Sequence, residues 1–355
     1  MNKENKKRVL FVTASTQGGG AERMLFYIMR SIGDNFETRL FITSKDKVPA
    51  EYAHDIIAQN ANKNHAISAF SKLLKYIRAF KPDHTFTTSS NVGYMLILAK
   101  KILGKKFSVN IRCAVTPSEI YHSDIKSRLL NHVIKLTYNY ADKIIAQTEF
   151  MKGDLISSYN ISEEKVQVIR NIVDFNMIES LSSKFIPTEI SAENKNIVAA
   201  GALYSVKGFD LLIDAIAPLL KTYNARLYIL GEERYETGYR SLLEEQIKKH
   251  NLSDKVFLLG HKDNPYPYYK AADLFVMSSR KEGYPNVVLE ALSLSTPVVA
   301  TDCVDWTGVI EDGVNGFVAK RNNIESLNVA LKKALTVNLT PEKVSIKNYD
   351  YNEFF

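Results

Sequence analysis

The stretch SSRKEGYPNVVLEALSLSTPVVATD, residues 278–302, runs from the end of an apolar strand through a loop and a helix into a second strand. Gly283 lies in the loop, the helix is predicted to begin near Asn286, and a Ser-Thr-Pro break ends it before PVVATD (297–302). A strand, a helix and a strand in this order are typical of a parallel sheet covered by helices. Parallel sheets bind ligands at the carboxyl ends of their strands, so this loop is a candidate site.

The same alternation extends outward along the whole chain. Short apolar runs rich in β-branched residues predict strands, and helical spacing fills the gaps between them. The pattern breaks near Asp174, and residues 176–194 are predicted to be a linker. The sequence therefore predicts an α/β protein with two doubly wound domains, residues 1–172 and 173–340. The predicted strands are residues 8–15, 37–44, 84–90, 106–113, 143–148 and 166–171, then 196–201, 225–231, 255–260, 274–279 and 297–302.

Composition fits an intracellular globular protein. The 355 residues are 45% hydrophobic and 24% charged, which is ample for two cores. Cys113 and Cys303 are too few for a disulfide framework or a four-ligand zinc site, which favours a reducing compartment. The chain has no run of about 18 apolar residues, and its polar opening lacks the apolar stretch of a signal peptide. We therefore expect a cytoplasmic protein.

Positive charge is concentrated in the amino-terminal half. Residues 1–180 hold 26 Lys and Arg against 17 Asp and Glu, whereas residues 181–355 hold 20 against 22. This asymmetry suggests nucleic acid or anionic lipid as a partner, although a well-solvated lysine-rich surface explains it equally well. Residues 65–83 and 95–107 combine apolar stripes with lysines, so we expect peripheral contact with an anionic membrane. The apolar stripes also suit packing on the domain's own sheet.

Two loops that follow predicted strands are suited to binding anions. TQGGGAER (16–23) lets backbone N–H groups approach a phosphate or sugar at a helix N-terminus, although it lacks the G-x-G-x-x-G dinucleotide pattern. In GALYSVKGFDLLIDA (201–215), Lys207 precedes a helix start and could neutralise a diphosphate together with the helix amides. A tight turn and a solvated lysine are the structural alternatives. The glycines of the first loop are Gly18, Gly19 and Gly20.

Two carboxylates accompany the loop and helix of residues 278–302. Glu282 is in the loop and Glu290 is in the early turns of the helix, so both could point into one pocket at the carboxyl edge of the sheet. There they could accept hydrogen bonds from sugar and ribose hydroxyls. Glu290 could equally be an ordinary solvated charge on the helix surface.

Together these segments resemble the retaining glycosyltransferases of family 4, which have the GT-B fold, and in particular their capsule, O-antigen and glycan-assembly branch. Glu282 and Glu290 match the family's E-x7-E pattern. Other segments match in the same order: GGGAER (18–23), RNIVD (170–174) as the interdomain N-x-x-D, KG (207–208) as the donor-diphosphate lysine, and IEDGVNGFVA (310–319) as the closing D-G-x-N-G. The resemblance implies two Rossmann-like domains that face each other across a cleft, an acceptor-binding domain followed by a nucleotide-sugar-binding domain.

The resemblance also implies roles for single residues. Lys207 would bind the donor diphosphate, Glu290 the ribose hydroxyls and Glu282 the hydroxyls of the transferred sugar. Arg112 falls where many relatives place a cation near that sugar, so Lys207, Glu282 and Arg112 are the candidate catalytic residues. We expect no metal, because no D-x-D pattern lies at a strand end, and no cofactor besides the UDP-sugar substrate. The backbone expected to approach the donor belongs to Gly18, Gly19, Gly20, Gly283, Tyr284, Pro285 and Asn286.

Two of the chain's departures from the family pattern bear on the predicted site and on the predicted domain bounds. Ala202 stands where the family usually has an arginine that contacts phosphate, so the cation must come from elsewhere or the protein is an inactive homologue. The candidate replacements are Arg23, Arg112 and Arg280. Residues 341–355 resemble the start of a helix that crosses back onto the first domain, so this helix is short or the sequence is truncated.

The implied reaction moves a hexose or N-acetylhexosamine from a nucleotide sugar, expected to be UDP-linked, to a glycan or polyprenyl-diphosphate-linked acceptor in bacterial surface polysaccharide or glycan assembly. An epimerase of the UDP-N-acetylglucosamine 2-epimerase type shares the two-domain architecture, but the histidines lie mostly away from predicted strand ends. A nucleic-acid-binding protein is suggested only by the pI near 9.0, without the motif of an RNA-binding module, so we expect no nucleic-acid partner.

Overall fold

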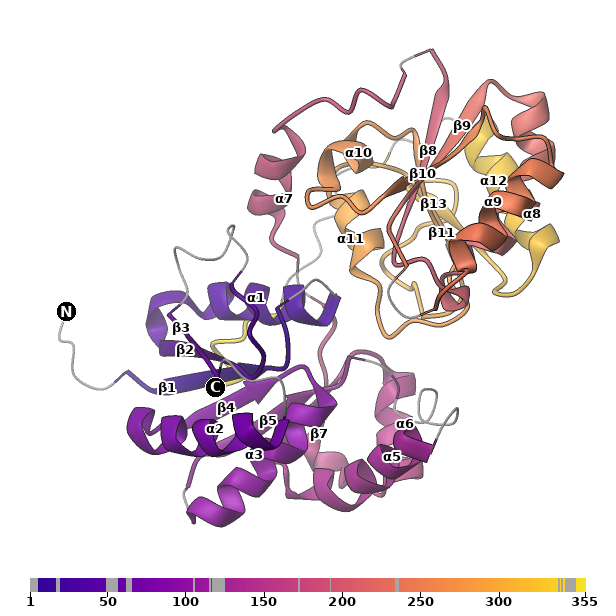
Figure 1. Ribbon diagram of the computed structural model, residues 1–355. Coiled ribbons are helices and arrows are strands. Elements are labelled where there is room, and N and C mark those ends of the chain that lie inside the picture. Colours follow the sequence, from indigo (N-terminus) through magenta and orange to yellow (C-terminus); the bar gives the residue numbers. More distant parts are fainter. Residues whose placement is uncertain are drawn as a thin grey trace. The chain divides into compact units, whose positions relative to one another are not determined.

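The computed structural model divides into two compact units, Met1–Ile172 with Asn348–Phe355 (unit 1) and Val173–Lys347 (unit 2). Each unit is a parallel sheet with helices packed against it (Figure 1). The structure describes residues 6–16, 20–48, 57–61, 66–104, 106–114, 116, 125–171, 173–191, 193–233, 236–337, 339, 341 and 349–355.

Unit 1 is built on a seven-stranded sheet with the order β3-β2-β1-β4-β5-β6-β7. Its central strands are apolar along their length because both faces of the sheet are covered. The order changes direction between β1 and β4, which pair in parallel, and this is where such sheets bind ligands. The strands are β1 (Arg8–Thr13), β2 (Glu37–Ile42), β3 (Ala58–Asn60), β4 (His84–Thr87), β5 (Ser108–Arg112), β6 (Lys143–Ala146) and β7 (Val166–Val168).

The helices of unit 1 cover its sheet unequally. Four of them share a core with alternate residues of the strands, such as Leu10 and Val12 of β1. α1 (Gly20–Ile32) lies on the other side of the sheet (Figure 1). The carboxyl-terminal residues pack on that side too, where Phe355 meets the rings of Phe11 and Phe86. The four helices are α2 (Ala66–Phe80), α3 (Ser90–Leu103), α5 (Ile125–Thr137) and α6 (Glu149–Tyr159).

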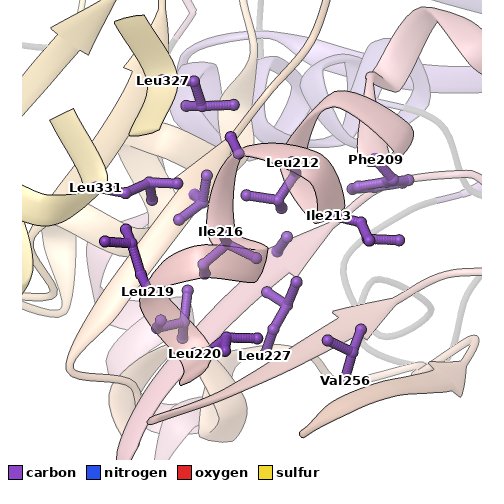
Figure 2. Close-up of a cluster of buried hydrophobic side chains, with 14 of the residues drawn as sticks. Phe209, Leu212, Ile213, Ile216, Leu219, Leu220, Leu227, Val256, Leu327 and Leu331 are labelled. Atoms are coloured by element: carbon purple, nitrogen blue, oxygen red, sulfur yellow. The ribbon is translucent and has the colours of Figure 1, made fainter. Parts of the chain in front are cut away.

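Unit 2 is built on a six-stranded sheet with the order β10-β9-β8-β11-β12-β13 and has one hydrophobic core on each face. Figure 2 shows the first core, where one face of α8 (Phe209–Thr222) packs between β9 and α12. The strands are β8 (Lys195–Ala200), β9 (Ala225–Leu230), β10 (Val256–Gly260), β11 (Leu274–Met277), β12 (Val298–Thr301) and β13 (Gly316–Ala319). The remaining helices are α7 (Phe175–Ser182), α9 (Tyr239–Lys249), α10 (Tyr266–Lys270), α11 (Asn286–Ser293) and α12 (Ile324–Thr336).

The structure confirms all the predicted strands and corrects the sequence analysis elsewhere. The predicted linker, residues 176–194, contains most of α7, whose first turn is capped by the Asp174 side chain accepting from the Met177 N–H at 3.0 Å. The sequence analysis did not predict the short strands β3 and β13. Residues 349–355, predicted within the start of a crossover helix, form turns on unit 1.

Candidate functional site

The loop after β8 bends back onto the end of β11. It passes through the 3-10 turn η4 (Ser205–Lys207) and Gly208 into α8. Gly208 has a φ of +64°, and a Cβ there would lie 2.2 Å from the Ser278 carbonyl oxygen, so only glycine fits. The Ser278 hydroxyl donates to the Lys207 carbonyl oxygen at 3.0 Å. This close approach places the Lys207 turn beside the loop that carries Glu282.

Lys207 and Glu282 form an ion pair at this edge of the sheet. Lys207 Nζ lies 2.5 Å from Glu282 Oε1, and the Ser279 hydroxyl donates to the same oxygen at 2.8 Å. The two side chains are only 19% and 16% exposed, so Lys207 is not a solvated surface lysine. Burial is the largest single effect and would lower the pKa of Lys207, but the Glu282 carboxylate and Tyr204 together outweigh it, and this pKa is raised above its usual value. A positive charge is therefore held in place here.

Arg280, in the loop after β11, holds the loop after β8 through several hydrogen bonds. Its guanidinium makes two bonds to the Asp210 carboxylate, at 2.8 and 2.6 Å, and a third to the Ser205 carbonyl oxygen. Its backbone N–H donates to the Val206 carbonyl oxygen at 2.8 Å. Burial alone would raise the pKa of Asp210, but the bonds from Arg280 and Tyr239 hold that pKa below its usual range. Arg280 is thus committed to holding η4.

This clamp was missed by the sequence analysis, which considered Arg280 only as a replacement phosphate contact. Its sequence signal is weak, because Asp210 in the first turn of α8 is also what the helix dipole alone favours. Tyr239, the first residue of α9, donates to the same carboxylate at 2.7 Å. The partners are far apart in the sequence, and only the fold brings them together.

Glu290 lies in the second turn of α11 and is completely buried. The alternative of a solvated surface charge is therefore wrong, since 0% of the residue is exposed. Buried carboxylates are rare outside paired or functional positions, because an ionised carboxylate is costly to remove from water. The structure also buries the residues that lead into α11, namely Gly283, Tyr284, Pro285 and Asn286.

The segment after β12 completes the surroundings of the ion pair. The Thr301 hydroxyl donates to the Ser279 carbonyl oxygen at 2.6 Å, and Trp306 Nε1 donates to the Thr301 carbonyl oxygen at 2.8 Å. Burial and the negative charge of Glu282 raise the pKa of the Cys303 thiol to about 12. Cys303 is therefore a neutral neighbour of the pair, and the sequence analysis missed this placement.

The site residues predicted in unit 1 are three glycines before α1 and the arginine at the end of β5. Gly18 and Gly19 lie outside the described residues, and Gly20 is the first residue of α1. Arg112 ends β5 and is only 1% exposed, and its contact with the transferred sugar stays a prediction. Side chains alternate along β5, and Ile111 lies in the core on the helix-covered face, so Arg112 lies on the opposite face, beside Tyr351 of the carboxyl-terminal residues.

The surroundings of Arg112 fit a structural role. Its guanidinium donates to Asn171 Oδ1, and the Tyr351 side chain is its neighbour from the carboxyl-terminal segment. Burial lowers the pKa of Arg112, and Tyr351 opposes that shift. Arg112 therefore joins β5, the segment after β7 and the end of the chain. The described residues contain no group of three His, Cys, Asp or Glu side chains arranged to hold a metal ion.

Two family models match the chain. Residues 18–176 match Glycosyltransferase Family 4, and residues 183–351 match Glycosyl transferases group 1. A *Campylobacter jejuni* relative is 31% identical over 335 residues, which cover 90% of this chain and 88% of the relative. It is named N-acetylgalactosamine-N,N'-diacetylbacillosaminyl-diphospho-undecaprenol 4-alpha-N-acetylgalactosaminyltransferase. An uncharacterized glycosyltransferase of *Methanocaldococcus jannaschii*, MJ1059, is 35% identical over 65% of this chain, and the match spans only 58% of that relative.

A solved structure supports the fold. Anabaena Alr3699/HepE in complex with UDP and glucose matches with a TM-score of 0.77 and 20% identity, over 92% of this chain and 89% of that chain. At this level of identity the likeness shows the fold alone. It confirms the predicted GT-B fold class.

Proposed function

Because this chain belongs to the family 4 glycosyltransferases, we propose that it moves a hexose or N-acetylhexosamine from a UDP-sugar to a glycan or a polyprenyl-diphosphate-linked acceptor, with retention at the sugar. The proposed setting is bacterial surface polysaccharide or glycan assembly. The ion pair of Lys207 with Glu282 carries the proposal, because it holds a cation and a sugar-hydroxyl acceptor side by side at the carboxyl edge of a parallel sheet. The names of HepE's ligands and of the *Campylobacter* relative support the UDP donor and the lipid-linked acceptor.

The proposed donor site lies in unit 2. Lys207 binds the diphosphate together with the N–H groups at the start of α8, and Glu282 accepts hydrogen bonds from the transferred sugar. The buried Glu290 accepts hydrogen bonds from the ribose hydroxyls. The backbone from Gly283 to Asn286, at the start of α11, lies against sugar and phosphate oxygens. Gly18, Gly19 and Gly20 are likewise proposed to bind the donor diphosphate.

The proposed chemistry needs no enzyme nucleophile, cofactor or metal ion. The bond between the anomeric carbon and the diphosphate oxygen breaks, and its electron pair leaves with UDP. The acceptor hydroxyl oxygen bonds to the same face of the anomeric carbon, and its proton passes to the departing phosphate. Lys207 and the helix amides stabilise the charge that develops on that phosphate. Arg112 is left out of this scheme because its guanidinium donates to Asn171 and neighbours Tyr351 within unit 1.

A lipid-linked acceptor would lie in a membrane, so we propose a cytoplasmic protein that meets an anionic membrane peripherally. The basic amino-terminal half supports this proposal. Nucleic acid is not a proposed partner.

Incubation of the protein with a panel of nucleotide sugars, followed by detection of released UDP, tests the proposed reaction. We expect release from one or a few UDP-sugars, stimulated by a polyprenyl-diphosphate-linked saccharide. Conversion of UDP-N-acetylglucosamine to an isomer without UDP release would indicate an epimerase. Failure of every nucleotide sugar to release its nucleotide, with or without acceptor, would contradict the proposal.

A further inference from the structure

Three neighbouring helices of unit 1 contain no acidic residue. α2, α3 and α5 comprise Ala66–Phe80, Ser90–Leu103 and Ile125–Thr137, without a single Asp or Glu. The other helices in the described part of unit 1, α1 and α6, both contain carboxylates. The acid-free helices pack into one core on the same face of the sheet (Figure 1), and their outer sides together are called here the basic layer. Its described cations are Lys72, Lys75, Arg78, Lys100, Lys101, Arg128 and Lys135.

The cations of the basic layer mostly face solvent. The apolar stripe of α2 faces inward, where Leu73 and Ile77 are buried in the core, so this stripe does not meet a membrane. The described side chains of Lys75, Arg78 and Lys135 are exposed and make no ion pair within the described part of the chain. Lys100 pairs with Asp142 at 2.7 Å, and the Lys72 ammonium donates to the Ala61 carbonyl oxygen at 2.6 Å.

Large apolar side chains are exposed among these cations. On α5, the exposed positions 128, 129, 132, 135 and 136 recur with helical spacing and include Leu129 and Leu136, which are 65% and 60% exposed. On α3, Leu98 and Ile102 are also exposed, one turn apart. The Lys101 ammonium lies 3.4 Å from the centre of the Tyr140 ring, so α3 contacts the 3-10 turn Tyr138–Tyr140 that follows α5.

We propose that the basic layer is the surface through which the protein docks on an anionic lipid bilayer. The assignment rests on the proposed peripheral contact with a membrane. Helices that carry cations and no carboxylate are attracted to anionic headgroups, and leucines between the cations can enter the headgroup boundary. Phosphates of nucleic acid would use the cations but not the leucines, so lipid explains both features. None of the helices in the described ranges is long and apolar enough to cross a bilayer.

Co-sedimentation of the intact protein with vesicles of equal parts phosphatidylglycerol and phosphatidylcholine tests the cationic part. We expect binding that weakens as salt rises, with no binding to pure phosphatidylcholine. The triple substitution Lys75→Gln, Arg78→Gln, Lys135→Gln should weaken binding about 100-fold, or about five-fold for each charge removed. The matched control substitutes three exposed lysines of unit 2, and it should bind like the wild type: Lys248→Gln, Lys249→Gln and Lys332→Gln.

A second pair of variants tests the apolar part. Leu129→Ser with Leu136→Ser should lower vesicle binding at moderately high salt by about ten-fold. Leu242→Ser with Val329→Ser, at exposed positions of unit 2, should leave it unchanged. All these positions are on the surface, and thermal melts establish that each variant is folded.

The outcomes separate the docking surface from the membrane contact itself. Vesicle binding by the wild type that the basic-layer variants keep would overturn the assignment of the surface alone. Absence of wild-type binding to anionic vesicles would overturn the membrane contact as well, while UDP release tests the transferase independently. Oligonucleotide binding that is lost with the triple substitution but kept by the leucine variant, without vesicle binding, would assign the layer to nucleic acid instead.

Discussion

Among the described residues, Glu282 is the one side chain that hydrogen-bonds Lys207, which directly precedes the Gly208 cap of α8. We expect Lys207→Ala to reduce sugar transfer about 10- to 150-fold, because a charge-assisted contact contributes about 1.5–3 kcal/mol. Stability should change less than activity, and a urea titration measures it beside the rate of UDP release. Unchanged turnover in a folded variant would remove Lys207 from the site.

The two carboxylates are expected to act on different parts of the donor. Glu290 is buried, and we expect Glu290→Gln to weaken the binding of UDP itself, because ribose hydroxyls lose a charged acceptor. Glu282→Gln should leave UDP binding nearly unchanged and reduce the use of the intact UDP-sugar about ten-fold or more. Calorimetric titration with UDP and initial rates with the UDP-sugar measure the two effects. Equal weakening of UDP by both substitutions would contradict this division.

The turn η4 depends on a side chain that does not touch the Lys207 ammonium in the structure. Arg280→Gln removes both bonds to Asp210 and the bond to the Ser205 carbonyl oxygen, so η4 loses its tether. We expect kcat/KM for the UDP-sugar to fall about ten-fold or more, with partial recovery in Arg280→Lys, which keeps the charge but loses the bidentate geometry. If Arg280 instead served only stability, the unfolding free energy would fall while kcat/KM stayed near the wild-type value.

Arg240→Gln is a matched control for this prediction. Arg240 also pairs with a carboxylate of unit 2, Glu244, at 2.9 Å, but both side chains are on α9 and are 41% and 47% exposed. Such an i,i+4 pair contributes about 0.3–0.5 kcal/mol, so its loss should leave both kcat/KM and stability close to the wild type.

The elements that could be predicted from sequence are those with a strong local pattern. Strands such as β1 and β11 are continuous apolar runs between turn residues, and their positions followed from periodicity alone. β3 and β13 have three and four residues and include exposed positions, so they lack such a run. α7 was not predicted because the serines and charges next to it are typical of linkers. Its cap at Asp174 is recognised only from the hydrogen bond that the Met177 N–H donates.

The candidate site was predictable where one segment carries the signal. Glu282, Glu290 and Lys207 each lie in a loop or helix that follows a predicted strand, and the family resemblance implied a role for each of them. The sequence left open whether Glu290 and Lys207 are solvated surface charges, and their burial in the structure excludes this. Arg112 is buried as well. Pairing over a long sequence distance, as between Arg280 and Asp210, leaves no local pattern to detect.

At the scale of the whole molecule, the last residues of the chain stabilise the first unit. Phe355 is 8% exposed and meets the rings of Phe11, Phe36 and Phe86, while Lys143 donates to the neighbouring Phe354 carbonyl oxygen at 2.7 Å. We expect Phe355→Ala to cost about 3 kcal/mol of unit 1 stability, measured by urea unfolding. Phe150→Ala, at a residue that is 67% exposed, should cost less than about 0.5 kcal/mol. Equal costs would mean that the carboxyl-terminal residues do not contribute to the core.

The two units should respond differently to nucleotide, because every proposed contact to UDP except the glycine loop lies in unit 2. UDP at about 100 times its Kd adds about 2.7 kcal/mol to the stability of the state that binds it. For a unit of this size, that corresponds to a rise in Tm of about 5–10 °C. Calorimetric scans should show this rise for the wild type and a much smaller one for Glu290→Gln. An oligonucleotide at the same phosphate concentration should give no comparable rise.

The same scans decide whether a metal ion takes part in nucleotide binding. Lys207 supplies the positive charge at the proposed diphosphate position, so we expect excess EDTA to leave both the UDP-induced rise in Tm and the rate of UDP release unchanged. Loss of either effect in EDTA, with recovery on adding Mg²⁺ or Mn²⁺, would mean that Lys207 and the helix amides do not suffice to neutralise the diphosphate. The absence of an arginine at Ala202 makes this test sharper, because one phosphate contact usual in the family is already missing.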